Sequence, residues 1–265
     1  MTARDVAYAA LDSEVDGIST DAGTAEELFA VVDLLDGQPT LRRSLSDPSA
    51  SDANRAHLAE RLLGGKISQA ALDVVVAIVK HSWNSGNRLV GALERQGIRL
   101  VLRSAHREGR IDDVTGDLYQ LSVTVDANRE LAGALRNAQY PLEGKRDLIN
   151  RLVSGKVHPA TAMLASRAAK ARKRTFALTA KSYVEMGAEI AGEEMALVTV
   201  ARPLDPQRVA RLKSALERQV GGPVNLQIEV DPAVLGGMSV VIGDDVIEST
   251  VAARLEDARR QLTTF

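Results

Sequence analysis

The feature that most constrains this chain is an internal repeat of ninety residues. Residues 28–73 align without gaps on residues 118–163, giving ten identities in 46 pairs, where composition alone gives about three or four. Leu58 and Leu62 lie four residues apart in the first copy, and the same spacing recurs at Leu148 and Leu152 in the second. A spacing of four places residues on one face of a helix. The sequence therefore predicts a duplicated helical module.

Each copy of the repeat contains a Gly-Lys pair, at Gly65 and Lys66 and again at Gly155 and Lys156. A phosphate-binding loop needs a glycine five residues before this glycine, and Ser or Thr after the lysine. Both copies fail at both positions, which hold Glu60 and Ile67 in the first copy and Asn150 and Val157 in the second. We therefore interpret the glycines as helix ends with positive φ. The following helices are expected to open near Ser68 and at Pro159.

Helical periodicity continues to about Glu189. It predicts helices over residues 3–11, 24–36, 39–46, 53–63, 68–82, 87–109, 112–126, 129–136, 143–153, 159–170 and 172–190. Asp112 or Asp113 is the expected N-cap of the helix that starts there.

After Gly192 the pattern changes to strands. Residues 195–201 and 224–230 read as strands, and a helix between them is expected to begin at the cap residue Asp205. A hairpin around residues 243–245 and a last helix at 250–262 follow.

The predicted fold class is mainly α, with two tandem helical-bundle modules followed by a small C-terminal α/β (β-α-β-β-α) domain. The expected domains are residues 1–95, 96–190 and 193–265.

Composition argues against several classes of function. The chain has no cysteine, so disulfides, thiolate metal sites and cysteine nucleophiles are excluded. Its four histidines share no metal-ligand spacing, and no pair of carboxylates stands out for acid–base work. We predict no catalytic, cofactor-binding or metal-binding residue. The longest apolar run, residues 74–79, is too short to span a bilayer, so membrane contact is expected only through partners.

Two segments carry charge of one sign. Residues 12–36 hold eight acidic residues and no Lys or Arg, and residues 167–181 hold six basic residues and no acid. Solvated helix faces are the usual cause of such runs. Docking on a partner protein or on nucleic acid is the alternative. The scarcity of aromatic residues, 3%, and a net charge of −2 argue against nucleic acid.

The C-terminal stretch "VDPAVLGGMSVVIGDDVIESTVAARLEDARRQL" resembles the signature of the delta subunit of F-type ATP synthases, the family that includes the mitochondrial oligomycin-sensitivity-conferring protein. The matching residues are Asp231, Pro232, Leu235, Gly236, Gly237, Gly243, Asp244, Val246, Ile247 and Leu255. The stretch "LSDPSASDANRAHLAERLLGGKIS" at 45–68 is also similar to the family's helical bundle. The doubled bundle resembles an extended subtype of this family.

The resemblance implies a non-catalytic stator subunit at the cytoplasmic face of the plasma membrane. It implies that the bundle binds the N-terminal segments of the catalytic head's alpha subunits, and that the C-terminal domain binds the b subunit of the peripheral stalk. A wide helix-in-groove contact suits a part that must resist torque. The alternatives are a helical nucleic-acid-binding or adaptor protein that uses residues 167–181, and an enzyme with an unrecognised carboxylate site.

Overall fold

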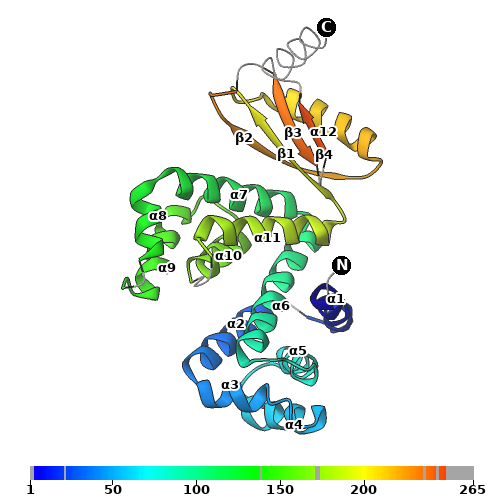
Figure 1. Cartoon of the computed structure of the whole chain (residues 1–265), viewed down its shortest axis with the longest axis vertical. Helices are drawn as coiled ribbons and strands as arrows, with labels where there is room; N and C mark the ends of the chain where they lie inside the picture. The colour runs from blue at the N-terminus through cyan, green and yellow to red at the C-terminus, as the bar shows by residue number, and fades with distance from the viewer. Residues whose placement is uncertain are drawn as a thin grey trace, which may run out of the picture. The chain divides into compact units, whose positions relative to one another are not determined.

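The computed structural model describes residues 3–20, 22–137, 139–170, 174–234, 237–242 and 245–248. The chain divides into two compact units, Met1–Glu108 and Gly109–Phe265. The described part of the first unit is helical, and the second unit joins a helical bundle to a sheet domain (Figure 1).

The described residues of the first unit form six helices. They are α1 (Ala3–Asp16), α2 (Ala22–Gly37), α3 (Pro39–Leu45), α4 (Asp52–Leu63), α5 (Gln69–Lys80) and α6 (Gly86–Arg107). Helix α2 packs along α6, and α4 packs on α5. The core is aliphatic, because helices rich in Ala, Leu and Val bury residues such as Leu28, Val74 and Leu93 completely.

Arg55 fastens the α3–α4 connection to the end of α5. The side chain is 5% exposed, and its Nε and Nη2 each donate a hydrogen bond of 2.8 Å, to the carbonyls of Val79 and Lys80. Its Nη1 also donates to the carbonyls of Asp47 and Ala50. A guanidinium can satisfy several carbonyls at once because its donors point outward in a fixed fork.

Five further helices lie in the described residues between Gly109 and Gly192 of the second unit. They are α7 (Ile111–Ala127), α8 (Arg129–Arg136), α9 (Leu142–Val153), α10 (Pro159–Ala169) and α11 (Phe176–Ala191). Helix α7 lies along α11, and α9 packs on α10. The prediction of an aspartate N-cap for α7 is wrong, because Arg110 holds the cap position and makes no side-chain capping bond. Asp112 and Asp113 lie in the first turn, where their charge suits the positive end of the helix dipole.

The helices of the two copies keep the ninety-residue offset that the sequence alignment shows. Four helices begin ninety residues apart in the two copies, at 39 and 129, 52 and 142, 69 and 159, and 86 and 176. The Gly65 and Gly155 backbones are both left-handed, with φ of 73° and 69°, as expected for a residue just beyond a helix. Shifting α1 by the same ninety residues gives residues 93–106, which lie inside α6. Helix α6 therefore ends one copy of the repeat and begins the next.

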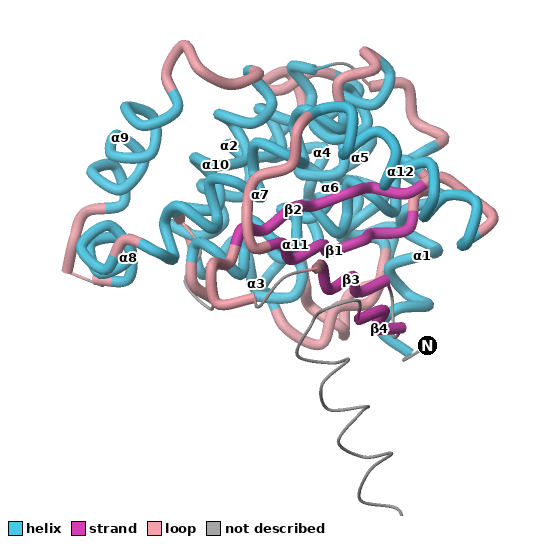
Figure 2. The backbone as a smooth tube through the Cα atoms, turned by 90° about the horizontal axis from the view of Figure 1, so that it is seen from above, coloured by secondary structure: helices cyan, strands magenta, loops and turns pink. Residues whose placement is uncertain are grey.

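In the described residues, the C-terminal part of the second unit is a sheet packed against one helix. Its elements are β1 (Glu194–Val200), α12 (Pro206–Val220), β2 (Val224–Val230), β3 (Met238–Ile242) and β4 (Asp245–Glu248). The strand order is β2-β1-β3-β4, with β1 and β2 parallel and the other pairs antiparallel (Figure 2). A β-α-β crossover joins parallel neighbours, which explains why a helix separates β1 from β2.

Alternation along the strands separates two faces of the sheet. Ala196, Val198 and Val200 of β1 form a core with Leu216 of α12. Asp205 caps α12 by accepting a hydrogen bond of 2.8 Å from the Arg208 N–H, as the sequence predicts. The opposite face carries the polar residues Asn225 and Gln227 of β2.

The predicted fold class is confirmed. The expected hairpin supplies β3 and β4, so the described sheet has four strands, one more than the order β-α-β-β-α counts. The last predicted helix, 250–262, lies outside the described residues. The division into domains 1–95, 96–190 and 193–265 stays a prediction about independent folding.

Candidate binding surfaces

The acidic segment 12–36 begins with a set of ion pairs between α1 and α6. Arg95, Arg99 and Arg103 are four residues apart and therefore follow one face of α6. Arg95 and Arg99 contact the carboxylate of Asp12, and Arg99 and Arg103 contact that of Asp16 at 3.0 and 2.6 Å. These carboxylates hold α1 on its own unit and are not offered to a partner.

Three more acidic residues of this segment, Glu14, Glu27 and Asp36, also make internal contacts. Glu14 lies 3.0 Å from His81, and Asp36 lies 3.6 Å from Arg42. Glu27 of α2 accepts hydrogen bonds from the N–H and the hydroxyl of Ser68, the N-cap of α5. Sequence reasoning missed these pairings, although the four-residue spacing of the arginines on α6 was a usable signal.

Asp117 is the counterpart of Glu27 in the second copy. Burial raises the pKa of its carboxyl above the ordinary value, and a hydrogen bond from the N–H of His158 acts in the opposite direction. His158 is the N-cap of α10. In both copies, therefore, a carboxylate from the second helix of the repeat contacts the residue that starts the fifth helix.

The basic segment 167–181 does not form one exposed face in the described part of the chain. Arg167 is 8% exposed, and the Lys181 ammonium lies 5.7 Å from the centre of the Tyr119 ring. Residues 171–173 lie outside the described residues. Internal contacts therefore occupy part of the charge on which a nucleic-acid surface would depend.

The Gly-Lys pairs have the wrong backbone polarity for a phosphate site. Gly65 and Gly155 follow the carboxyl ends of α4 and α9, where the helix dipole is negative. The N–H of Lys66 donates to Leu63 and that of Lys156 donates to Val153, at 2.9 and 3.0 Å. These N–H groups are already bonded to the helix and cannot cradle an anion.

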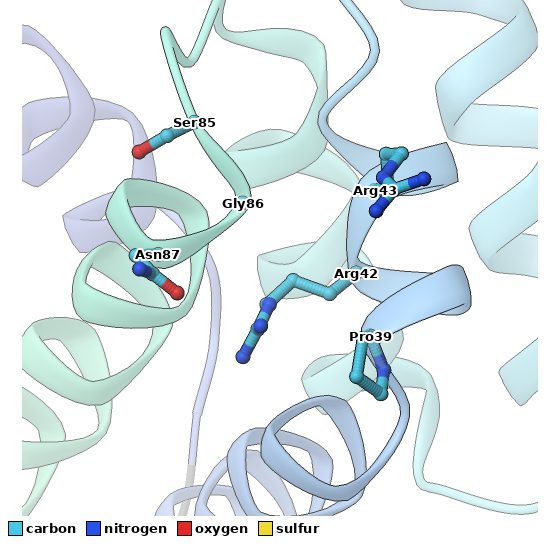
Figure 3. Close-up of a pocket in the computed structure, with 6 residues that line it drawn as sticks. All are labelled: Pro39, Arg42, Arg43, Ser85, Gly86 and Asn87. Carbon is cyan, nitrogen blue, oxygen red and sulfur yellow. The ribbon is translucent and has the colours of Figure 1, made fainter.

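A hollow of about 210 Å³ lies between α3 and the start of α6. It is lined by Pro39, Arg42, Arg43, Ser85, Gly86 and Asn87. Figure 3 shows the Arg42 side chain extending from α3 toward the start of α6. No carboxylate or imidazole among the described residues lines this hollow, so nothing there can take a proton from Ser85.

The histidines are dispersed over the described helices. His57 and His106 are exposed on α4 and α6, His81 faces Glu14, and His158 caps α10. Within the described residues, no group of three or more histidine, aspartate or glutamate side chains could hold a metal ion.

A polar contact joins α7 to the edge strand β2 within the second unit. The Tyr119 hydroxyl lies 3.2 Å from the Glu229 carboxylate, and Gln120 donates to the Ile228 carbonyl at 3.3 Å. Asn225 of β2 donates to Glu193 at 3.0 Å. Burial, and secondly the charge of Glu229, raise the pKa of the Tyr119 hydroxyl, so it stays protonated and donates to that carboxylate. The sheet therefore meets α7 through specific hydrogen bonds.

The signature residues begin at the end of β2. The N–H of Asp231 donates to the Val200 carbonyl at 2.9 Å, and its carboxylate accepts from the Ala233 N–H at 2.8 Å, which makes a turn that contains Pro232. Gly237 has φ of 81°, a conformation that favours glycine. Ile247 lies in β4 opposite Val240. Leu235, Gly236, Gly243, Asp244 and Leu255 lie outside the described residues.

Comparison with known proteins agrees with the resemblance of the C-terminal half to the delta subunit of F-type ATP synthases. The family model "ATP synthase delta (OSCP) subunit" matches residues 101–262. An ATP synthase subunit delta of Parafrankia sp. is 40% identical over 240 residues, which are 90% of this chain and 86% of that protein. The chain belongs to the ATP synthase delta (OSCP) subunit family.

A second relative matches almost the whole of this chain. The ATP synthase subunit delta of Streptomyces griseus is 38% identical over 254 residues, covering 95% of this chain and 94% of that protein. A chain in the cryo-EM structure of the Toxoplasma gondii mitochondrial ATP synthase hexamer is 21% identical, with a TM-score of 0.33, and covers 63% of this chain and 94% of that chain. The family model covers the second bundle and the sheet domain, whereas the bacterial relatives also match most of the first bundle.

Proposed function

We propose that this protein is the non-catalytic stator subunit that links the catalytic head of an F-type ATP synthase to its peripheral stalk. The observation that carries the proposal is the family match over residues 101–262, extended over 95% of the chain by a relative of nearly equal length. As a member of this family, the protein is a subunit of an enzyme complex.

The architecture supports a mechanical role. A stator resists torque through wide contacts between rigid elements, and a bundle of packed helices supplies such elements. The α1–α6 ion pairs and the Arg55 hydrogen bonds stiffen the first bundle, and the Tyr119–Glu229 and Gln120–Ile228 contacts fix the sheet on α7. A load applied to the sheet therefore passes directly into the second bundle.

The division of partners follows the division of structure. In our proposal the bundles bind the N-terminal segments of the alpha subunits, and residues 193–265 bind the b subunit. Amphipathic helices dock on apolar surfaces between bundle helices, whereas the sheet domain offers a separate surface for the stalk.

The proposed location is peripheral, at the cytoplasmic face of the bacterial plasma membrane. None of the helices in the described ranges is both long enough and apolar enough to cross a bilayer. In the proposal, attachment to the membrane is provided by the other subunits of the synthase.

A bridging assay tests the proposal. The soluble part of the b subunit is immobilised and the catalytic head, prepared without this protein, is added with and without the full chain. We expect the head to be retained only when the full chain is present. A chain shortened to residues 1–190 should bind the head yet fail to bridge it to the b subunit. Retention of the head by neither form would refute the function.

A further inference from the structure

Helices α4 and α9 hold equivalent positions in the two copies of the repeat, ninety residues apart, and they bury apolar side chains of similar total size. Helix α4 buries Ala56, Ala59 and Leu63, and α9 buries Ile149 and Val153. Each helix packs on the one that follows it, α5 or α10. Because the buried apolar groups are similar in size, the hydrophobic effect holds the two helices about equally. Their polar contacts therefore decide which helix is held more firmly.

The guanidinium that fastens α4 has no counterpart on α9. Arg55 donates four hydrogen bonds to main-chain carbonyls, two in the connection before α4 and two at the end of α5. The same position of α9 holds Lys145, which is 7% exposed and donates no hydrogen bond to any described residue. An ammonium on a flexible stem lacks the planar fork of donors, so it does not replace the guanidinium.

The start of α9 also lacks the cap that α4 has. The Ser51 hydroxyl accepts a hydrogen bond of 3.3 Å from the Asn54 N–H at the start of α4. Pro141 holds the cap position of α9 and makes no side-chain capping bond, and Gly144 stands where α4 has Asn54. Both differences lower the stability of a helix start.

Helix α9 does contact α10 through the side chain of Arg146. Its Nε donates to the Ser166 hydroxyl at 3.2 Å, and its Nη1 lies 3.1 Å from the Glu143 carboxylate, which belongs to α9 itself. The Arg146 side chain is 37% exposed, so water competes for these contacts. They therefore contribute less than the four bonds of the buried Arg55 guanidinium.

The rest of the second bundle has contacts of its own that do not involve α9. Helix α7 lies along α11 (Figure 1), and α10 contacts both. The sheet meets α7 through Tyr119 and Gln120. A movement of α9 would uncover Ile149 and Val153 and leave these other contacts in place.

We propose that α9 is a movable helix, which opens from the second bundle while α7, α10 and α11 stay packed, whereas α4 opens only when the first unit unfolds. Local opening is expected where an element has few buried contacts with its neighbours. The second copy of the repeat can thereby change its surface and still hold the sheet. This inference stands apart from the proposed function, because it concerns the single chain without partners.

Amide hydrogen exchange of the full chain, followed by mass spectrometry at several urea concentrations, tests the proposal. After correction for local sequence, peptides from residues 142–153 should exchange about thirtyfold faster than peptides from residues 52–63. Exchange in α9 should depend only weakly on urea, because local opening exposes little surface. Exchange in α7 and α11 should follow the steep urea dependence of global unfolding.

Reciprocal substitutions test the cause of the opening. Lys145→Arg gives α9 the missing fork and should slow its exchange about tenfold, whereas Arg55→Lys removes the fork from α4 and should make its exchange about thirtyfold faster. Lys156→Arg and Arg61→Lys are matched controls, because they make the same changes at exposed positions of the two copies. The controls should leave exchange in both helices unchanged, and circular dichroism melting checks that all variants are folded.

Two results would overturn the proposal. In the first, α9 of the wild-type chain exchanges at the rate and with the urea dependence of α7 and α11, so that it opens only with the whole bundle. In the second, Lys145→Arg and Arg55→Lys both leave exchange in their own helices unchanged, so that the fork does not control the opening. Faster exchange of α4 in Arg55→Lys supports the proposal even if the longer side chain of Lys145→Arg does not fit its site.

Discussion

Replacing Arg55 by alanine should selectively destabilise the first unit. The side chain donates four hydrogen bonds to main-chain carbonyls from a site that is 5% exposed. A hydrogen bond from a charged group contributes about 1.5–3 kcal/mol, and bonds that share one side chain are not additive. Water can reach some of the freed carbonyls, so we expect a loss of about 3 kcal/mol in the free energy of unfolding. For a unit of this size that is about 12–24 °C in melting temperature.

The assay uses the one tryptophan of the chain. Trp83 lies in the first unit, is 8% exposed, and donates from Nε1 to the Ile78 carbonyl at 2.7 Å, so its fluorescence reports unfolding of that unit. Urea titration of the full chain should show a lower midpoint with an unchanged slope. Arg55→Lys should lose about 2 kcal/mol because the fork is lost while the charge remains, whereas exposed Arg61→Ala should lose less than about 0.5 kcal/mol. A loss below about 1 kcal/mol for Arg55→Ala would refute the reasoning.

Three further perturbations follow from the same structure. Asp117→Asn should raise the melting temperature at pH 7. Burial raises the pKa of the Asp117 carboxyl in the folded chain above the ordinary value of 3.8 that it has in the unfolded chain. The free energy of unfolding of the wild-type protein therefore falls as the pH rises through the folded-state pKa, and the asparagine variant has no such loss. Melting scans from pH 4 to 8 check this, and parallel curves for the two proteins would contradict it. Asp12→Asn should cost about 2–3 kcal/mol, because Asp12 is 7% exposed and faces two arginines, whereas the more exposed Asp16→Asn should cost about 1 kcal/mol or less. Urea titrations followed by Trp83 fluorescence measure both losses. Equal losses of unfolding free energy for Asp12→Asn and Asp16→Asn would contradict the argument from burial. Gly65→Ala should lower the free energy of unfolding by about 1 kcal/mol, because φ is 73° and the added methyl group meets no atom within 4 Å. Gly237→Val should lower it more, because a β-branched residue is strained at a φ of 81°. Equal melting shifts in calorimetry for the two glycine variants would remove that distinction.

Local signals in the sequence predict most of the helices. The eleven helices expected before Gly192 are all present in the described residues, and the cap at Asp205 is found as predicted. These features depend on neighbouring residues, which is why one sequence suffices to find them. The prediction of an aspartate cap on α7 was wrong for a similarly local reason. An aspartate in the first turn serves the helix dipole about as well as one at the cap, and the pattern does not separate the two positions.

The sequence did not predict the ion pairs between residues that lie far apart in the chain. Helix α1 was expected to end at residue 11, but it continues to Asp16. Its last turns carry Asp12 and Asp16, whose arginine partners lie more than eighty residues away in the chain. Periodicity records which residues share a face, but not which distant face supplies the opposite charge. The same limit explains why the acidic segment 12–36 could be read as a docking surface.

The boundary between the two copies of the ninety-residue repeat falls inside helix α6 and not between two helices. The duplicated length of ninety residues starts and stops inside a helix, since residues 93–106 stand where α1 stands one period earlier. A cut at the predicted domain boundary, between residues 95 and 96, therefore severs the hydrogen-bonded ladder of α6 and separates Arg99 and Arg103 from Arg95. Added copies of such a period would lengthen the chain by continuing a helix, with no new linker at the point of joining. A part that must carry load gains from growing in this way, because a flexible joint is never inserted there.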